Sequence, residues 1–177
     1  MKRFMYTAAT GSLVLMFVFF ILMSNTHKNV FLTLGITSMT ICYHFTMRLV
    51  IGSVMARISL SQFDPDSFRF RERGFERKLY KALRVKKWKK FAPTYDDNLF
   101  DLTKNPIDNV IGETCRAESV HWLCAAAGLA SIALTSVFGS LPAFLITGIA
   151  SALVDMVFIV IQRYNRPRLM RYAAKKG

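Results

Sequence analysis

Four long apolar runs constrain this chain more than any other feature. They cover residues 4–23, 30–55, 120–138 and 141–161. A helix needs about 20 apolar residues to cross roughly 30 Å of hydrocarbon, and each run has about that length. The first run carries no charge, and only Arg48 brings a cation into the second. We therefore predict an all-α integral membrane protein with four transmembrane helices.

Lysine and arginine are distributed unevenly around these runs. The chain holds 24 Lys and Arg against 11 Asp and Glu, a net charge of +13. Two of these cations precede the first run, fourteen lie within residues 57–116 and six follow the fourth run, whereas the two remaining connections hold only Lys28. Short loops rich in Lys and Arg stay in the cytoplasm. Both termini and the central segment are therefore predicted to be cytoplasmic.

The connections between the runs suggest how the chain is organised. The last two runs are separated by only a few residues, so they are expected to form an antiparallel hairpin, and the first two are joined almost as tightly. We predict a first transmembrane hairpin, a cytoplasmic insert, a second hairpin and a basic cytoplasmic tail, which together make one domain. Their bounds are residues 1–58, 59–119, 120–162 and 163–177.

The first half of the central insert has the composition of a membrane-surface helix. Residues 74–90 read GFERKLYKALRVKKWKK, which places Phe75, Leu79, Ala82 and Leu83 on one helical stripe and the cations elsewhere. Basic amphipathic helices of this kind lie on the anionic inner leaflet. We predict one such helix here, with Trp88 close behind the stripe.

The basic charge could instead indicate a nucleic-acid partner. The cations are confined to the flanks of the apolar runs, where phospholipid headgroups are the nearest polyanion, so we expect membrane lipid and no nucleic acid. Some of the arginines could grip a phosphorylated substrate, because guanidinium groups pair well with phosphate oxygens. The three cysteines are too few and too scattered for a disulfide framework.

Three polar residues lie at membrane depth, where ionisable groups are costly and become site candidates by default. His44 and Arg48 are four residues apart and share one helical face, and Asp155 lies near the cytoplasmic end of the fourth run. An Arg48–Asp155 pair inside the bundle and a catalytic role for either residue are both open interpretations.

A denser polar cluster precedes the third run, in the sequence GETCRAESVHW at residues 112–122. On a helix, Glu113 lies two turns before His121, and Glu118 lies three residues before it. A carboxylate that orients the imidazole would make His121 a general base. The alternative is a salt-bridge ladder of Glu113, Arg116 and Glu118, with His121 and Trp122 as headgroup-level anchors. No second histidine is nearby, so we expect no metal site.

The last polar block, QRYNRPRL at residues 162–169, follows the fourth run. A simple basic flank would need only cations, whereas here Tyr164 and Asn165 are interleaved with Arg163, Arg166 and Arg168. Donors arranged in this way suit a phosphate or a developing oxyanion. The alternative is a positive flank with an incidental polar mixture.

Three blocks together carry a family resemblance: residues 68–74 with 85–89, residues 113–122, and residues 162–169. In this order they resemble the glycosyl-4,4'-diaponeurosporenoate acyltransferases, small bacterial membrane proteins of staphyloxanthin-type carotenoid synthesis. The resemblance covers residues 68–171, and QRYNRPRL is its most specific part. Cys115 stands where lysine is expected in the family, so we do not assign it as an acyl-carrying nucleophile.

The resemblance implies a lipid O-acyltransferase of the bacterial cell membrane. It would move a fatty acyl chain from a cytoplasmic thioester to a hydroxyl of a membrane glycolipid or glycosyl carotenoid, an amphiphilic lipid substrate. Acyl-CoA or acyl carrier protein would be the co-substrate, and no bound cofactor is expected. His121 with Glu118 or Glu113 would be the catalytic base. The residues expected to bind substrate are Arg116, Trp122, Arg163, Tyr164, Asn165, Arg166, Arg168 and Trp88.

Two other functions fit the same residues. A small membrane methyl- or prenyltransferase could use the basic surface for another anionic donor. A non-catalytic membrane adaptor would also carry basic flanks, but it predicts that the three polar blocks point to scattered surfaces. The sequence specifies neither the acyl chain, nor which Glu pairs with His121, nor the oligomeric state.

Overall fold

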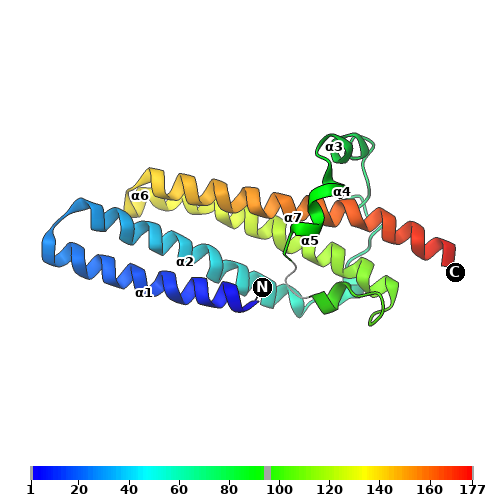
Figure 1. The fold of residues 1–177 in the computed structure, drawn as a ribbon, viewed down its shortest axis with the longest axis horizontal. Coiled ribbons are helices and arrows are strands. Elements are labelled where there is room, and N and C mark those ends of the chain that lie inside the picture. Colours follow the sequence, from blue (N-terminus) through cyan, green and yellow to red (C-terminus); the bar gives the residue numbers. More distant parts are fainter. Residues whose placement is uncertain (1, 94–96, 177) are drawn as a thin grey trace. The chain divides into compact units, whose positions relative to one another are not determined.

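The computed structural model describes residues 2–93 and 97–176, and these residues form helices and connecting segments with no strand. The fold is drawn in Figure 1. The helices, with the short 3-10 helices marked η, are α1 Lys2–Thr26, α2 Asn29–Ala56, η1 Leu60–Gln62, α3 Glu76–Ala82, α4 Val85–Trp88, η2 Lys89–Phe91, η3 Asp97–Phe100, α5 Ile107–Ala130, η4 Ser131–Leu134, α6 Thr135–Phe138 and α7 Leu141–Lys176.

Within the described residues, four helical stretches are long and apolar enough to cross a membrane. They are α1, α2, the continuous stretch Ile107–Phe138 and α7. Many of their large apolar side chains are exposed, as a lipid-facing surface requires. The predicted all-helical fold class and the count of four apolar helices are therefore confirmed.

Two of these helices extend well beyond the apolar runs that predicted them. Helix α5 begins at Ile107, ahead of the run at residues 120–138, and α7 continues through Pro167 to Lys176. Much of the extension of α5 is buried, so its polar residues continue the helix within the packed part of the protein. Its buried residues include Val110, Ile111, Thr114, Cys115, Glu118 and Ser119.

The insert differs from the single helix predicted for residues 74–90. Helix α3 ends at Ala82, Arg84 adopts a left-handed conformation with φ 51°, and α4 begins at Val85. Tyr80 and Val85 are both buried against Tyr164. Residues five apart on a continuous helix point roughly 140° away from each other, so a break is needed to bring both to one partner. The predicted stripe of Phe75, Leu79 and Leu83 is exposed.

The chain divides into two compact units, and each is described by itself. The charged unit comprises Val54–Trp122 and Met156–Gly177, and the apolar unit comprises Lys2–Ser53 and Leu123–Asp155. All the polar blocks named above lie in the charged unit. His44, Arg48 and Asp155, which were predicted to lie at membrane depth, are in the apolar unit.

In the apolar unit, α1 and α2 run antiparallel (Figure 1). Phe4 near the start of α1 meets Phe45 of α2 edge-on, with ring centroids 5.8 Å apart. Near the other end, a Cβ atom added to Gly35 would lie 2.9 Å from the Phe20 ring, so a larger residue there would require this ring to shift. The connection is short, and His27 within it has a φ of 53°.

Candidate functional site

Arg163 of α7 is the centre of a buried ion network in the charged unit. Its guanidinium group donates to Glu76 Oε1, at 2.5 Å from Nη2, and to Glu118 Oε1, at 2.8 Å from Nη1. Two further hydrogen bonds reach the carbonyl oxygens of Arg69 and Arg71. With the additional bond from Nε to Glu76, all five N–H groups of Arg163 are used. This side chain therefore ties the insert and α5 to α7.

Arg166 completes the network from the next helical turn. Its side chain is 1% exposed, and its Nη2 atom lies 2.5 Å from Glu118 Oε2. The same guanidinium donates to the hydroxyl and the carbonyl oxygen of Thr114 and to the carbonyl oxygen of Phe70. It also lies over the Phe70 ring, 4.9 Å from the centroid. Buried charges need such pairing to offset their loss of hydration.

The network brings the three polar blocks of the sequence together. Residues 68–74 supply carbonyl oxygens, residues 113–122 supply Thr114 and Glu118, and residues 162–169 supply Arg163 and Arg166. This convergence is not what a scattered arrangement of polar surfaces would give. In this network the guanidinium N–H groups of Arg163 and Arg166 donate to acceptors within the protein.

Glu76 was not among the predicted site residues. It is buried, and its second oxygen accepts a 2.6 Å hydrogen bond from the Tyr80 hydroxyl. Burial and the hydrogen bond to Glu76 raise the pKa of the Tyr80 phenol, which keeps the donor protonated. One signal was available in the sequence: Glu76 is the only acidic residue between Arg73 and Lys90.

The two predicted partners of His121 have different neighbours. Glu113 is held by Arg116, its neighbour one turn along α5, in a two-pronged ion pair, and Arg116 also reaches the carbonyl oxygen of Ala56. Glu118 is fully buried and accepts from Arg163 and Arg166 rather than from Arg116. Of the salt-bridge ladder predicted from the sequence, the pair between Glu113 and Arg116 is therefore present. The pairing of a glutamate with His121 stays a prediction.

His121 is half-buried on α5, one turn after Glu118. Its ring stacks on Phe158 of α7, with centroids 4.8 Å apart and an interplanar angle of 9°. Trp122 beside it is exposed. The stacking fixes the plane of the imidazole. Among the residues described, no group of three or more His, Cys, Asp and Glu is placed to hold a metal ion.

A second group of cations surrounds Tyr164. Its ring is buried against Tyr80 and Val85, with Trp88 packed alongside. The Arg168 guanidinium lies over the ring at 3.4 Å from the centroid, and Lys89 Nζ lies 4.9 Å from it. Lys89 also donates to Asn165 Oδ1 at 2.5 Å. The Trp88 indole donates to the carbonyl oxygen of Leu83 at 2.9 Å, so its ring is fixed within the insert.

His44, Arg48 and Asp155 form a separate cluster in the apolar unit. Arg48 Nη2 lies 2.6 Å from Asp155 Oδ2 and 2.8 Å from the Ser151 hydroxyl. His44 is buried next to this pair, and neither of its ring nitrogens has a hydrogen-bond partner among the described residues. The Arg48–Asp155 ion pair is thus one of the two arrangements anticipated from the sequence.

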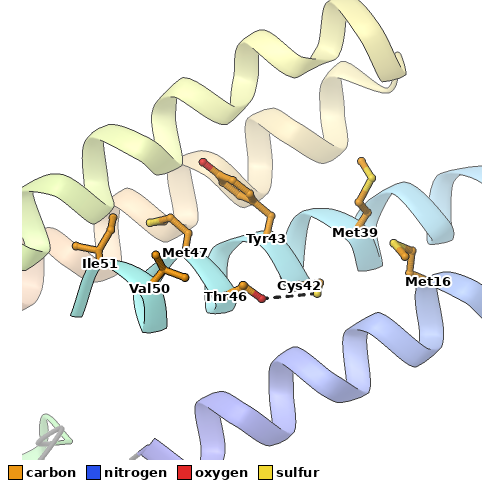
Figure 2. Close-up of a pocket in the computed structure, with 8 residues that line it drawn as sticks. All are labelled: Met16, Met39, Cys42, Tyr43, Thr46, Met47, Val50 and Ile51. Atoms are coloured by element: carbon orange, nitrogen blue, oxygen red, sulfur yellow. Dashed lines mark hydrogen bonds between the residues drawn. The ribbon is translucent and has the colours of Figure 1, made fainter. Parts of the chain in front are cut away.

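The same unit contains an open groove of about 440 Å³ (Figure 2). Three methionines line it, and the Cys42 thiol lies 3.9 Å from the Thr46 hydroxyl. Methionine side chains adapt their shape to irregular apolar surfaces. The full lining comprises Met16, Met39, Cys42, Tyr43, Thr46, Met47, Val50 and Ile51.

Comparison with known proteins identifies the family. The family described as glycosyl-4,4'-diaponeurosporenoate acyltransferase matches residues 65–175, more than half of the chain. The chain belongs to this acyltransferase family. A relative named glycosyl-4,4'-diaponeurosporenoate acyltransferase, from Staphylococcus aureus (strain Newman), is 29% identical over 152 residues, which cover 76% of this chain and 88% of the relative. No solved structure matches the chain. The matched residues include the whole arginine–glutamate network and His121.

Proposed function

We propose that this acyltransferase is a membrane-embedded lipid O-acyltransferase. It moves a fatty acyl chain from a thioester, acyl-CoA or acyl carrier protein, to a hydroxyl of a membrane glycolipid. The name of the relative specifies a glycosylated diaponeurosporenoate as the acyl acceptor, and we propose an amphiphilic acceptor of this class here. The observation that carries the proposal is the family match over residues 65–175, which contains His121 and the arginine–glutamate network.

His121 is the proposed general base. As the acceptor hydroxyl attacks the carbonyl carbon of the thioester, the imidazole takes the hydroxyl proton and a new C–O bond forms. The C–S bond of the tetrahedral intermediate then breaks, and the thiolate leaves with the proton that His121 holds. Stacking on Phe158 keeps the ring in one plane during both steps. A fixed base of this kind lowers the entropic cost of reaching the reactive geometry.

Glu118, Arg163 and Arg166 act as positioning residues in this proposal. Their donors and acceptors are occupied by one another and by the insert, so they hold α5 and α7 in register within the charged unit. Arg168 is exposed, and Asn165 and Trp88 are half-buried. These three are the proposed substrate-binding groups, together with Arg116, Trp122 and Tyr164. This division differs from the substrate-binding role predicted for Arg163 and Arg166.

The proposed membrane arrangement follows the charge distribution. Two transmembrane hairpins place both termini and the insert in the cytoplasm of a bacterial cell, where thioester donors are available. The exposed Phe75, Leu79 and Leu83 of the insert, flanked by lysines and arginines, would then rest on the inner leaflet. An amphiphilic acceptor could reach such a site without leaving the membrane.

The first test of the proposal is acyl transfer by purified protein in lipid nanodiscs. Labelled acyl-CoA and a total lipid extract of the host would be supplied, and new labelled lipid measured. We expect the substitution His121→Gln to lower the rate by about 10²- to 10⁴-fold, the usual contribution of a general base.

His27→Gln provides the matched control, because His27 is exposed in the connection between α1 and α2 and should leave the rate unchanged. Retention of the full rate in folded His121→Gln protein would rule out the base assignment. Label that fails to appear with either donor, acyl-CoA or acyl carrier protein, would contradict the proposed reaction.

A further inference from the structure

Lys89, which is half-buried, and Arg168, which is exposed, differ from the buried cations of the charged unit. Arg163 and Arg166 are neutralised by Glu76 and Glu118. In contrast, no carboxylate in the described part of the chain forms an ion pair with Lys89 or Arg168. Both cations lie against the one aromatic ring of Tyr164. This leaves two positive charges gathered on a fixed surface without a counter-charge.

The hydrogen bonds of the two cations leave donors available. Arg168 uses Nη1 to reach the carbonyl oxygen of Tyr164, and its guanidinium plane is held by the ring. Lys89 uses one of its three N–H groups for Asn165, and the other two find no acceptor among the described residues. Burial lowers the pKa of Lys89, and the positive charge of Arg168 lowers it further. An anion between them would remove that repulsion.

We propose that Lys89 and Arg168 form a phosphate-binding site on the Tyr164 ring. Guanidinium and ammonium donors suit the oxygens of a phosphate group, and here both lie against the one ring of Tyr164. The inference rests on the proposed function for its biological meaning. The phosphate belongs either to a phosphopantetheine-bearing acyl donor or to a phospholipid headgroup. The existence of the site itself does not depend on catalysis.

The spacing along α7 suits a donor that carries phosphate and thioester at opposite ends. Phe158, which stacks on His121, precedes Arg168 by ten residues, or about 15 Å of helix axis. Phosphopantetheine is an extended arm that separates its phosphate from its thioester. A donor phosphate at Arg168 would therefore let the arm run along α7 toward His121.

The first arm of the test is equilibrium binding of coenzyme A, which carries no acyl group and cannot turn over. With protein in detergent micelles free of phospholipid, we expect Lys89→Gln and Arg168→Gln each to weaken binding about tenfold, the effect of losing one charge-assisted contact. Lys78→Gln and Lys175→Gln remove one exposed charge from the same two segments and serve as matched controls, with unchanged affinity.

The second arm measures retention of phosphatidylglycerol by native mass spectrometry. Loss of coenzyme A affinity in the two variants would assign the phosphate to the donor, and loss of lipid retention would assign it to a headgroup. Coenzyme A affinity and lipid retention equal to those of the controls would overturn the site.

Lys89→Arg, which keeps the charge, should retain binding and guards against a folding defect. The His121→Gln protein should bind coenzyme A normally, so failure of this site and failure of the proposed reaction are distinguishable.

Discussion

Charge compensation distinguishes the individual polar residues of the charged unit. Glu118 is fully buried, and it accepts one arginine on each carboxylate oxygen. A buried carboxylate in this position is stable only because its partners offset the lost hydration. Removing Glu118 should therefore lower the free energy of unfolding by more than its hydrogen bonds contribute, because Arg163 and Arg166 would stay in place with uncompensated charge.

Glu118→Gln tests this compensation. The substitution keeps the shape but removes the negative charge between Arg163 and Arg166, and we expect it to lower the free energy of unfolding by about 3 kcal/mol. Unfolding in mixed micelles would measure the change. Glu72→Gln is the control, because its partners Arg77 and Arg171 are both exposed, and exposed pairs contribute little. Equal losses in the two variants would show that Glu118 is not a buried structural charge.

At the scale of elements, the insert shows how tertiary contacts divide a helix. The composition of residues 74–90 favours one amphipathic helix, but Tyr80 and Val85 both pack on Tyr164. The left-handed conformation of Arg84 makes this possible, at a cost of about 1 to 2 kcal/mol for a residue with a side chain. The basic segment is thus anchored to α7 through its polar and aromatic face. Its apolar stripe is left exposed.

The ion pair between α2 and α7 in the apolar unit provides a second test at this scale. Asp155→Leu leaves Arg48 without its carboxylate, and Arg48→Met leaves Asp155 without its guanidinium, so each should lower the free energy of unfolding by about 3 to 5 kcal/mol. The double variant should lose less than the sum of the two, because no uncompensated charge remains. Arg57→Met, at an exposed arginine, is the control. Additive losses would contradict direct coupling of the two residues.

At the scale of the whole molecule, the cations decide the proposed orientation. Twenty-two of the 24 Lys and Arg lie before the first apolar run, between the second and third, or after the fourth. Moving these segments across a membrane would be opposed at each of them, so one orientation is strongly favoured.

Cysteine labelling from outside intact cells tests this orientation. Single cysteines at Lys28 and Ser140, in the two short connections, should react with a membrane-impermeant thiol reagent. Cysteines at Lys78 and Lys175 should react only after the membrane is permeabilised. The parent protein provides the background from its native Cys42, Cys115 and Cys124, all of which are free thiols. The opposite labelling pattern would reverse the proposed topology.

The sequence by itself determined the features that depend on local patterns. Apolar runs of bilayer length predicted four long helices, and the spacing of Glu113, Glu118 and His121 placed all three on one helix, as α5 confirms. The family resemblance likewise rested on short contiguous blocks, and the match to residues 65–175 confirms it.

Only the tertiary structure decided which charges meet. Arg163 is 87 residues from Glu76 and 45 from Glu118, and no local periodicity links them. The same holds for Lys89, which reaches Asn165 across 76 residues of chain. Hydropathy and helical spacing report on neighbours along the chain, whereas a buried ion pair depends on which distant donors and acceptors are desolvated together. That is why Glu76 was missed, and why the roles of Arg163 and Lys89 emerge only from the folded chain.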